Sequence, residues 1–190
     1  MKRAILLRHG VTEANRLHRY CGSTDLPLDS AALEAFLAER RVYPDPSGYR
    51  ILTSGMVRTE QTLRAIYGEL PHGQERDFRE MDFGFFENRT YEELKDDPAY
   101  QVWLAGNNEE NRCPGGESGA EMTARVLAAW ERLEEDTLLV THGGVIAALM
   151  AHLFPGEAKT RYQWQPRPFG GYVITVTPAG LQYESLFPEK

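Results

Sequence analysis

The stretch Leu6–Asn15, LLRHGVTEAN, joins the end of an apolar run to an arginine, a histidine and a glycine. The run over residues 4–7 is apolar without alternation, which is typical of a strand buried on both faces of a parallel sheet. Such a strand delivers Arg8 and His9 to its carboxyl end, and Gly10 permits a tight turn and close approach of a ligand. Ligands of open α/β sheets bind beyond the carboxyl ends of the strands. His9 is therefore the candidate reactive group.

Strand and helix patterns alternate along the rest of the chain. Short apolar runs predict strands over residues 3–7, 50–53, 76–79, 137–141, 171–177 and 181–185. Helical spacing predicts helices over 12–16, 30–41, 55–70 and 145–154, one or two short helices within 90–105, and a long helix from Ser118. Ser54 is a candidate cap for helix 55–70, and Ser118 with Glu121 forms a capping-box pattern. The alternation predicts a three-layer α/β/α sandwich whose sheet is mostly parallel, with at least one antiparallel strand at its end.

Composition limits the partners and the location that we expect. The chain has 190 residues, 42% of them hydrophobic, and no low-complexity linker, so we expect one domain over residues 1–190. Acidic residues number 28 against 21 basic ones, and the formal charge of −7 without a basic run argues against nucleic acid as a partner. No segment resembles a membrane span or a signal-peptide core, so we expect a cytoplasmic protein without a membrane partner. Cys21 and Cys113 lack metal-ligand spacing, so we expect neither a metal nor a disulfide.

Polar groups follow three of the predicted strands. Arg8 and His9 follow the first strand, Arg58 lies early in the helix after the second, and His142 follows a later one. An arginine in the first turns of a helix opposes the helix dipole, at a cost of up to about 1 kcal/mol. A bound anion would offset this cost, because helix N-termini and arginine side chains both bind phosphate. The pattern therefore predicts a phosphate site.

A histidine beside two arginines is suited to attack a phosphoryl group. The neighbouring positive charge disfavours the imidazolium form and leaves a ring nitrogen free, so His9 would form a phosphohistidine. Positioned cations and N–H groups provide most of the catalysis in phosphoryl transfer, so we expect neither a metal nor a cofactor. The leaving alkoxide needs a proton, and Glu80, in the aromatic loop EMDFGFFEN, is the first candidate donor, with Asp82 the second.

Five motifs occur in order along the chain: RHGVTEAN, TSGMVRTEQT, REMDFGFFEN, PGGES and VTHGGV. Over residues 4–148 the chain thereby resembles the histidine phosphatase superfamily, also called the phosphoglycerate mutase-like family. The resemblance implies that His9 is the phosphorylated nucleophile and Glu80 the proton donor. The phosphate pocket that it implies comprises Arg8, Asn15, Arg58, His142 and the backbone of Gly143.

The segment Gly22–Leu28, GSTDLPL, resembles the substrate-side loop of this family. We expect Cys21, Gly22 and Ser23 to lie on the substrate side of the site. Four further arginines are candidates either for substrate contact or for ordinary surface charges: Arg16, Arg19, Arg89 and Arg112.

The leading functional hypothesis is a metal-independent phosphomonoesterase that acts on a small phosphorylated metabolite. The alternative is a cofactor-dependent phosphomutase of the phosphoglycerate mutase type, which would return the phosphoryl group to a second hydroxyl. A third hypothesis, from a different class, is a non-catalytic module that binds a phosphorylated ligand. The presence of His9, Arg58, Glu80 and His142 together counts against this third hypothesis.

Overall fold

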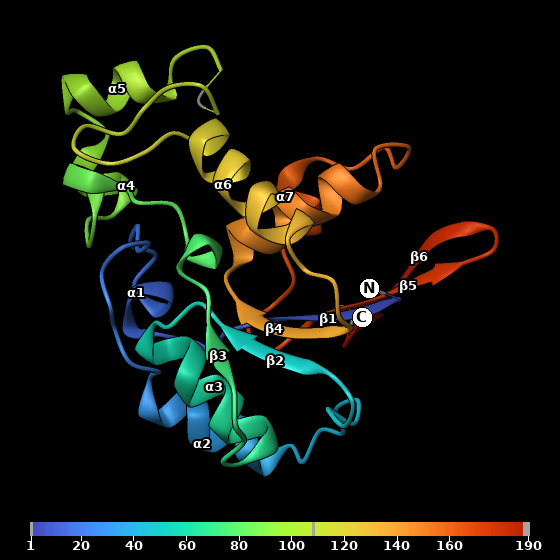
Figure 1. Cartoon of the computed structure of the whole chain (residues 1–190). Helices are drawn as coiled ribbons and strands as arrows, with labels where there is room; N and C mark the ends of the chain where they lie inside the picture. The colour runs from blue at the N-terminus through green and yellow to red at the C-terminus, as the bar shows by residue number, and fades with distance from the viewer. Residues whose placement is uncertain (1, 108, 188–190) are drawn as a thin grey trace.

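The computed structural model describes residues 2–107 and 109–187, in which a mixed sheet is covered by helices on both faces (Figure 1). In this part of the chain the strand order is β3-β2-β4-β1-β5-β6. The strands are β1 (Arg3–Arg8), β2 (Arg50–Thr53), β3 (Gly73–Gln74), β4 (Thr137–Thr141), β5 (Gly171–Thr177) and β6 (Gly180–Leu186). The first four are parallel to one another, whereas β5 is antiparallel to β1 and β6 antiparallel to β5. The predicted fold class is confirmed.

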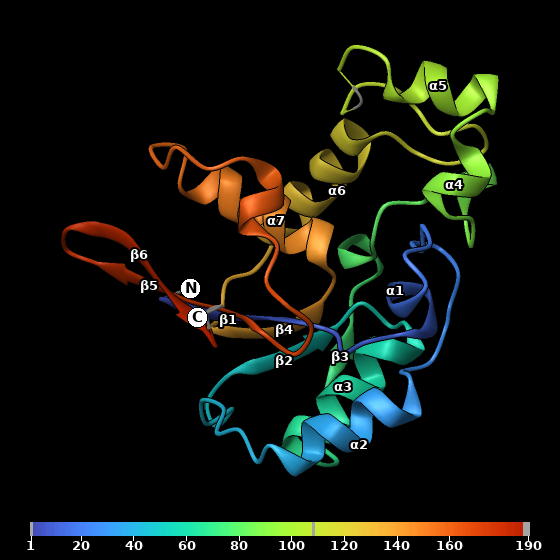
Figure 2. The same ribbon diagram turned by 180° about the vertical axis from the view of Figure 1, so that it is seen from behind.

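Helices form the two outer layers of the fold. The α-helices are α1 (Glu13–Arg16), α2 (Ser30–Ala38), α3 (Val57–Tyr67), α4 (Tyr91–Leu94), α5 (Pro98–Leu104), α6 (Gly119–Glu131) and α7 (Gly143–Leu153). Three 3₁₀ turns are described, η1 (Arg76–Phe78), η2 (Gly84–Phe86) and η3 (Arg161–Trp164). Helices α2 and α3 cover one face of the sheet, and α6 and α7 cover the other (Figures 1 and 2). Helix α1 lies beyond the carboxyl ends of the parallel strands.

Strand β1 contributes side chains to both cores, which explains why its apolar run does not alternate with polar residues. Ala4 and Leu6 pack in the core on the α6 and α7 side, whereas Ile5 and Leu7 pack with Leu63 of α3 on the opposite face. All of these side chains are buried. The central position of β1 fixes the place of the two residues that follow it, because a strand held on both faces has little freedom to shift its register.

Several local predictions are wrong, each for an identifiable reason. Residues 76–79 form no strand, because the Glu75 side chain caps the 3₁₀ turn η1, and β3 lies earlier, at Gly73–Gln74. Helix α2 ends at Ala38, so the arginines at positions 40 and 41 lie outside it, and Arg40 has a φ of 48°. The N-cap residue of helix α3 is Met56, which makes no side-chain capping hydrogen bond, and the Ser54 side chain has another partner described below.

Other predicted elements are confirmed with small changes of boundary. The capping box of Ser118 and Glu121 begins α6, and two short helices occupy part of 90–105. Helix α7 begins two residues earlier than predicted, at Gly143, so that it follows His142 directly. Cys21 and Cys113 are free thiols. Among the described residues, no helix has the length and hydropathy needed to cross a membrane.

Candidate active site

The two histidines of the predicted site follow neighbouring strands at matched positions. Arg8, the last residue of β1, is in register with Thr141, the last residue of β4. The residue that follows each strand is a histidine, His9 after β1 and His142 after β4. The ring centroids of His9 and His142 lie 5.1 Å apart with an interplanar angle of 63°. Both side chains are buried. Parallel pairing of β1 with β4 therefore assembles the centre of the site from two distant motifs.

The hydrogen bonds of His9 define which nitrogen is free to react. Nδ1 lies 2.7 Å from the Gly10 carbonyl oxygen, so Nδ1 carries the proton and donates it. In the neutral ring, Nε2 then has a lone pair available for attack. A Cβ at position 10 would overlap the ring of Phe169, so Gly10 allows Phe169 to pack against the backbone beside His9. The close approach of a ligand to Gly10 stays a prediction.

The proton positions on His142 are set by a chain of buried hydroxyl groups. Arg58 Nε donates to His142 Nδ1 at 3.3 Å, so the proton of the neutral ring lies on Nε2, which donates to Ser54 Oγ at 2.8 Å. The Thr59 hydroxyl donates to the Met56 carbonyl at 2.7 Å. The Ser54 hydroxyl therefore donates to Thr59 Oγ1, 3.2 Å away. This chain fixes His142 in one tautomer and one ring orientation.

Arg58 is a buried cation and Arg8 a half-buried one, and the hydrogen bonds of both within the described residues go to uncharged groups. Arg58 donates to the carbonyl oxygens of Gly22 at 2.8 Å and Thr24 at 2.9 Å, and Arg8 donates to the Pro166 carbonyl at 2.8 Å. The Nε of Arg8 is buried without a hydrogen-bond partner, and neither arginine forms a salt bridge within the described residues. Buried charges are normally paired. Their arrangement leaves positive potential for an anionic ligand.

Burial and these arginines keep both imidazoles neutral. Burial lowers the pKa of His9 well below its usual value, and the positive charges of Arg58 and Arg8 lower it further. The pKa of His142 is lowered in the same way, by burial first and then by Arg58 and His9. Burial also lowers the pKa of both arginines below the usual arginine value. A neutral imidazole beside guanidinium groups is the form that a nucleophile for phosphate requires.

Glu80 reaches the site from the segment that follows η1. Its Oε2 accepts the N–H of Gly144 at 2.8 Å, and its Oε1 accepts the N–H of Met81 at 3.0 Å. The carboxylate is therefore held at the N-terminus of α7, next to the position of His142, and it lines the cavity above His9. A Cβ at Gly144 would overlap Glu80 Oε1, so the helix start must be glycine at this position for the carboxylate to fit.

Asp82, the second candidate donor, has a structural environment. Its Oδ1 accepts the Ser23 hydroxyl at 2.9 Å and the Gly84 N–H at 2.8 Å, and it does not line the cavity. Phe86, from the same aromatic loop, is buried, and Phe83 lines the cavity. Phe85 is 74% exposed. The geometry favours Glu80 over Asp82 as the group that faces a bound ester.

Asn15 lines the pocket, whereas Gly143 does not. Asn15 lines the cavity, but its Oδ1 is used in a capping box, where it accepts the Thr12 N–H at 3.0 Å. The side-chain amide nitrogen is the group that Asn15 can offer to a phosphate oxygen. Gly143 is the first residue of α7, and a Cβ there would lie 3.1 Å from the Arg8 guanidinium carbon. The absence of a side chain lets Arg8 pack against the start of α7.

The substrate-side loop is held by a residue that the sequence analysis missed. The carboxylate of Glu87 accepts the backbone N–H groups of Gly22 and Ser23, each at 2.9 Å, and the Thr24 hydroxyl at 2.7 Å. Cys21 lines the cavity, and the Gly22 carbonyl binds Arg58. Glu87 therefore fixes the loop that orients Arg58. A single glutamate in an aromatic loop gives no local signal of this role.

Arg125 of α6 is a second residue that the sequence analysis missed. Its guanidinium forms a two-bond ion pair with Glu117 at 2.9 and 2.8 Å. The same group donates to the carbonyl oxygens of Asp77, Arg79 and Glu80 at 2.8, 2.8 and 3.0 Å. Arg125 thereby holds the segment that carries Glu80. Glu117 belongs to the PGGES motif, so this motif acts through Arg125 and not by direct contact with the cavity.

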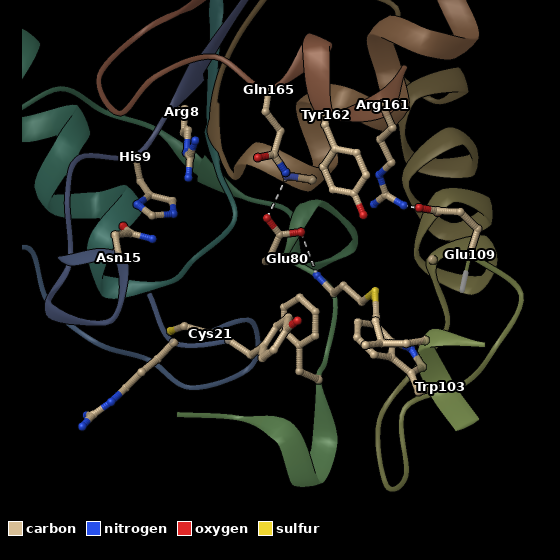
Figure 3. A pocket seen from close by; sticks show the side chains of 17 residues that line it. Arg8, His9, Asn15, Cys21, Glu80, Trp103, Glu109, Arg161, Tyr162 and Gln165 are labelled. Atoms are coloured by element: carbon tan, nitrogen blue, oxygen red, sulfur yellow. Dashed lines mark hydrogen bonds and ion pairs between the residues drawn. The ribbon is translucent and has the colours of Figure 1, made fainter. Parts of the chain in front are cut away.

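These groups open into a cavity of about 380 Å³ (Figure 3). Arg8, His9 and Asn15 line one end of it, whereas Arg58 and His142 do not line it. Of the four arginines left undecided by the sequence, Arg19 lines the cavity. The other three form surface ion pairs: Arg16 with Glu13 and Asp29, Arg89 with Asp97, and Arg112 with Glu121.

An α/β fold with a mixed sheet, and with paired histidines and two arginines without salt bridges among the described residues at its strand ends, is typical of the phosphatase and phosphomutase class. The family model of the histidine phosphatase superfamily (branch 1) matches residues 4–187. The chain therefore belongs to the histidine phosphatase superfamily, as its motifs indicated.

Individual relatives within this superfamily differ in their named activities. The chain is 31% identical to "Probable phosphoglycerate mutase GpmB" of Yersinia enterocolitica, over 92% of this chain and 91% of that protein. It superimposes on a solved phosphoglycerate mutase of Thermus thermophilus with a TM-score of 0.74 and 27% identity, covering 98% of this chain and 99% of the other. An α-ribazole phosphatase of Shigella flexneri has a TM-score of 0.81 at 24% identity, covering 99% and 100% of the two chains, and shares the fold.

Proposed function

We propose that the protein is a metal-independent phosphomonoesterase that works through a phosphohistidine at His9. The observation that carries the proposal is a pair of guanidinium groups, the buried Arg58 and the half-buried Arg8, which lie beside a neutral imidazole and have no salt bridge within the described residues. A phosphate dianion supplies the charge that these groups lack. The same cations stabilise the charge that spreads over the phosphoryl oxygens during transfer.

The reaction has two steps. In the first step, His9 Nε2 attacks phosphorus, the P–O bond to the alcohol breaks, and the Glu80 carboxylic acid gives its proton to the departing oxygen. In the second step, a water molecule attacks phospho-His9 while Glu80 accepts a proton from it. The P–N bond breaks, inorganic phosphate leaves, and the neutral imidazole is restored. Asn15 and the backbone of Gly143 provide further contacts to the phosphate in this proposal.

A phosphomutase of the phosphoglycerate type is the second candidate function, favoured by the 31% identity to a protein named as a phosphoglycerate mutase. It would share the first step and differ in the acceptor, which would be a hydroxyl group of a bound ester instead of water. Dependence on a bisphosphorylated primer and isomerisation faster than hydrolysis would distinguish it.

The test combines a panel of phosphomonoesters with detection of the phosphoenzyme. We expect release of inorganic phosphate in the presence of EDTA, inhibition by vanadate, and an acid-labile, alkali-stable phosphoenzyme that is absent from His9→Ala. Survival of the phosphoenzyme in His9→Ala would identify another nucleophile. Sensitivity to chelation would contradict metal independence, and an absence of both turnover and phosphoenzyme would leave a phosphate-binding module as the explanation.

A further inference from the structure

A second cavity, also of about 380 Å³, is lined by two parts of the chain: the segment 159–167 around η3, and the end of the β5–β6 pair. We call it the terminal-strand cavity. Tyr172 of β5 is paired with Ser185 of β6, so both side chains lie on one face of the sheet, and both line this cavity. Tyr162 and Gln165 line it as well as the active-site cavity (Figure 3). None of the groups used in the proposed reaction lines it.

The charges that line the terminal-strand cavity have one sign. Lys159 and Arg167 contribute two positive charges, and none of the described lining residues is acidic. The whole chain, in contrast, has a formal charge of −7. A cleft lined by charges of one sign concentrates ions of the opposite sign. The terminal-strand cavity is therefore suited to an anion.

Arg167 has hydrogen-bonding capacity that the described part of the chain does not use. Its Nε is buried without a hydrogen-bond partner, and its guanidinium forms no salt bridge within the described residues. Its guanidinium carbon lies 5.9 Å from the ring centroid of Phe187, which also lines the cavity. Buried polar atoms normally have a partner. A ligand in the cavity would supply one.

Lys159 and Gln163 offer further donors to the same cavity. Lys159 Nζ donates to the Tyr183 hydroxyl at 2.7 Å, and the other N–H groups of the ammonium remain available. Glu157, which lies 3.7 Å from Lys159 Nζ, does not line the cavity. The Oε1 of Gln163 accepts the Thr160 N–H at 2.8 Å, so its amide nitrogen is the group left to donate. The polar groups that remain are thus mainly donors, as an anion requires.

We propose that the terminal-strand cavity binds a small phosphate anion, either inorganic phosphate or the phosphate group of a small metabolite, between Arg167 and Lys159. A phosphate group carries about −1.5 to −2 charges at pH 7, which balances two cations, whereas a single carboxylate leaves one of them unpaired. The planar donor fork of an arginine also matches phosphate oxygens. This site is separate from the phosphoryl chemistry at His9, and the proposal does not depend on the proposed function.

The test is a titration of the full chain with inorganic phosphate, followed by NMR of the arginine Nε–H groups. The Arg167→Gln variant assigns the Arg167 signal by its loss. We expect this signal to shift with a Kd on the order of 1 mM, because two charge-assisted hydrogen bonds at a partly exposed site supply about this affinity. Chloride at the same ionic strength should not shift it, and succinate, a dicarboxylate dianion, should bind more weakly than phosphate.

Two further variants connect the signal to the cavity. Lys159→Gln removes the second cation and should raise the Kd measured at Arg167 by about fivefold or more. Arg76→Gln is the matched control, because it removes the same charge from an exposed arginine that lines neither cavity. It should leave the Kd unchanged.

Phosphate in the active site offers an indirect route to the same signal, because Arg8 donates to the carbonyl of Pro166 at 2.8 Å, next to Arg167. The ¹⁵N signals of the His9 ring report binding in the active site separately. An Arg167 signal that followed the His9 midpoint and ignored Lys159→Gln would overturn the proposal. The absence of a phosphate-dependent shift at Arg167, or a lower Kd for succinate than for phosphate, would overturn it as well. None of these results would alter the phosphoenzyme test of the proposed function.

Discussion

The Nε2–H of His142 donates to the hydroxyl of Ser54 at 2.8 Å, so the residue that follows β2 orients the ring that follows β4. Both side chains are fully buried. This contact explains why Ser54 does not cap α3: its hydroxyl is already committed to His142 and Thr59. The strand-end serine therefore acts on the site through an imidazole, as a positioning residue.

Ser54→Ala should lower kcat by about 5- to 100-fold with little change in KM. Loss of the acceptor leaves a buried N–H unpaired, which corresponds to about 1–3 kcal/mol, and allows the His142 proton to move to Nδ1, against Arg58. Steady-state kinetics measures the first effect, and ¹⁵N NMR of the imidazole nitrogens reports the tautomer. Ser47→Ala, at an exposed serine in the loop before β2, is the control. An unchanged tautomer together with unchanged kcat would show that Ser54 has no positioning role.

Arg58→Ala should reduce turnover by about 100- to 1000-fold, by comparison with the loss of one preorganised oxyanion donor. The charge of Arg58 lowers the pKa of His9, and its N–H groups donate to the Gly22 and Thr24 carbonyls. Kinetics with a single phosphomonoester measures the loss, and thermal unfolding shows whether the variant remains folded. A folded variant with a loss below tenfold would exclude Arg58 from the phosphate pocket.

Glu80→Gln should slow hydrolysis of alkyl phosphates by about 100-fold or more and affect phenyl phosphates less, because a phenolate leaves with little need of a proton. Asp82→Asn is the comparison, since Asp82 lies outside the cavity and binds Ser23. Kinetics on a matched alkyl and aryl pair measures the difference. If the two esters lost activity equally in Glu80→Gln, or if Asp82→Asn showed the larger alkyl effect, Glu80 would not be the proton donor.

Local sequence predicted the features that depend on neighbouring residues. The apolar run of β1 followed by Arg8 and His9, and the equivalent run of β4 before His142, predicted both strands and the end of the sheet where their polar residues meet. The capping box of Ser118 was equally visible. The prediction of a strand over residues 76–79 was wrong because the side chain of Glu75 caps a 3₁₀ turn there instead.

Contacts between residues that are far apart in the sequence could not be predicted from local patterns. Glu87 binds the loop at Gly22 and Thr24, which lies 63 to 65 residues earlier in the chain. Arg125 donates to the carbonyl groups of Asp77, Arg79 and Glu80, which lie 45 to 48 residues before it. Neither residue follows a strand or breaks a local rule. The aromatic side chains that line the active-site cavity are another case, because Tyr20, Phe83 and Trp103 come together only when the chain folds.

Stability should depend on pH through the two buried histidines. Burial and nearby arginines lower the pKa of His9 and His142 in the folded protein well below 6.5, whereas in the unfolded chain both have ordinary values near 6.5. At pH values between the lowered pKa of the folded protein and about 6.5, the unfolded state therefore binds more protons than the folded state. The contribution to stability is complete above about pH 6.5 and is lost progressively as the pH falls below it.

Chemical denaturation at intervals from pH 7.5 to 5.5 measures this effect. The free energy of unfolding should fall on acidification, with a slope that approaches about 1.4 kcal/mol per pH unit for each histidine. His9→Asn removes one of the two titrating groups and should roughly halve the slope.

His72 serves as an internal contrast: its backbone hydrogen bond to Leu70 and its bond to Glu60 raise its pKa, so its contribution to stability is present below about pH 6.5 and is lost above it. His72→Gln should therefore leave the acid-side loss in place. A free energy of unfolding that stayed constant from pH 7.5 to 5.5 would mean that folding does not lower the pKa values of the two imidazoles, so that burial and the neighbouring arginines would not keep His9 neutral as the pH falls.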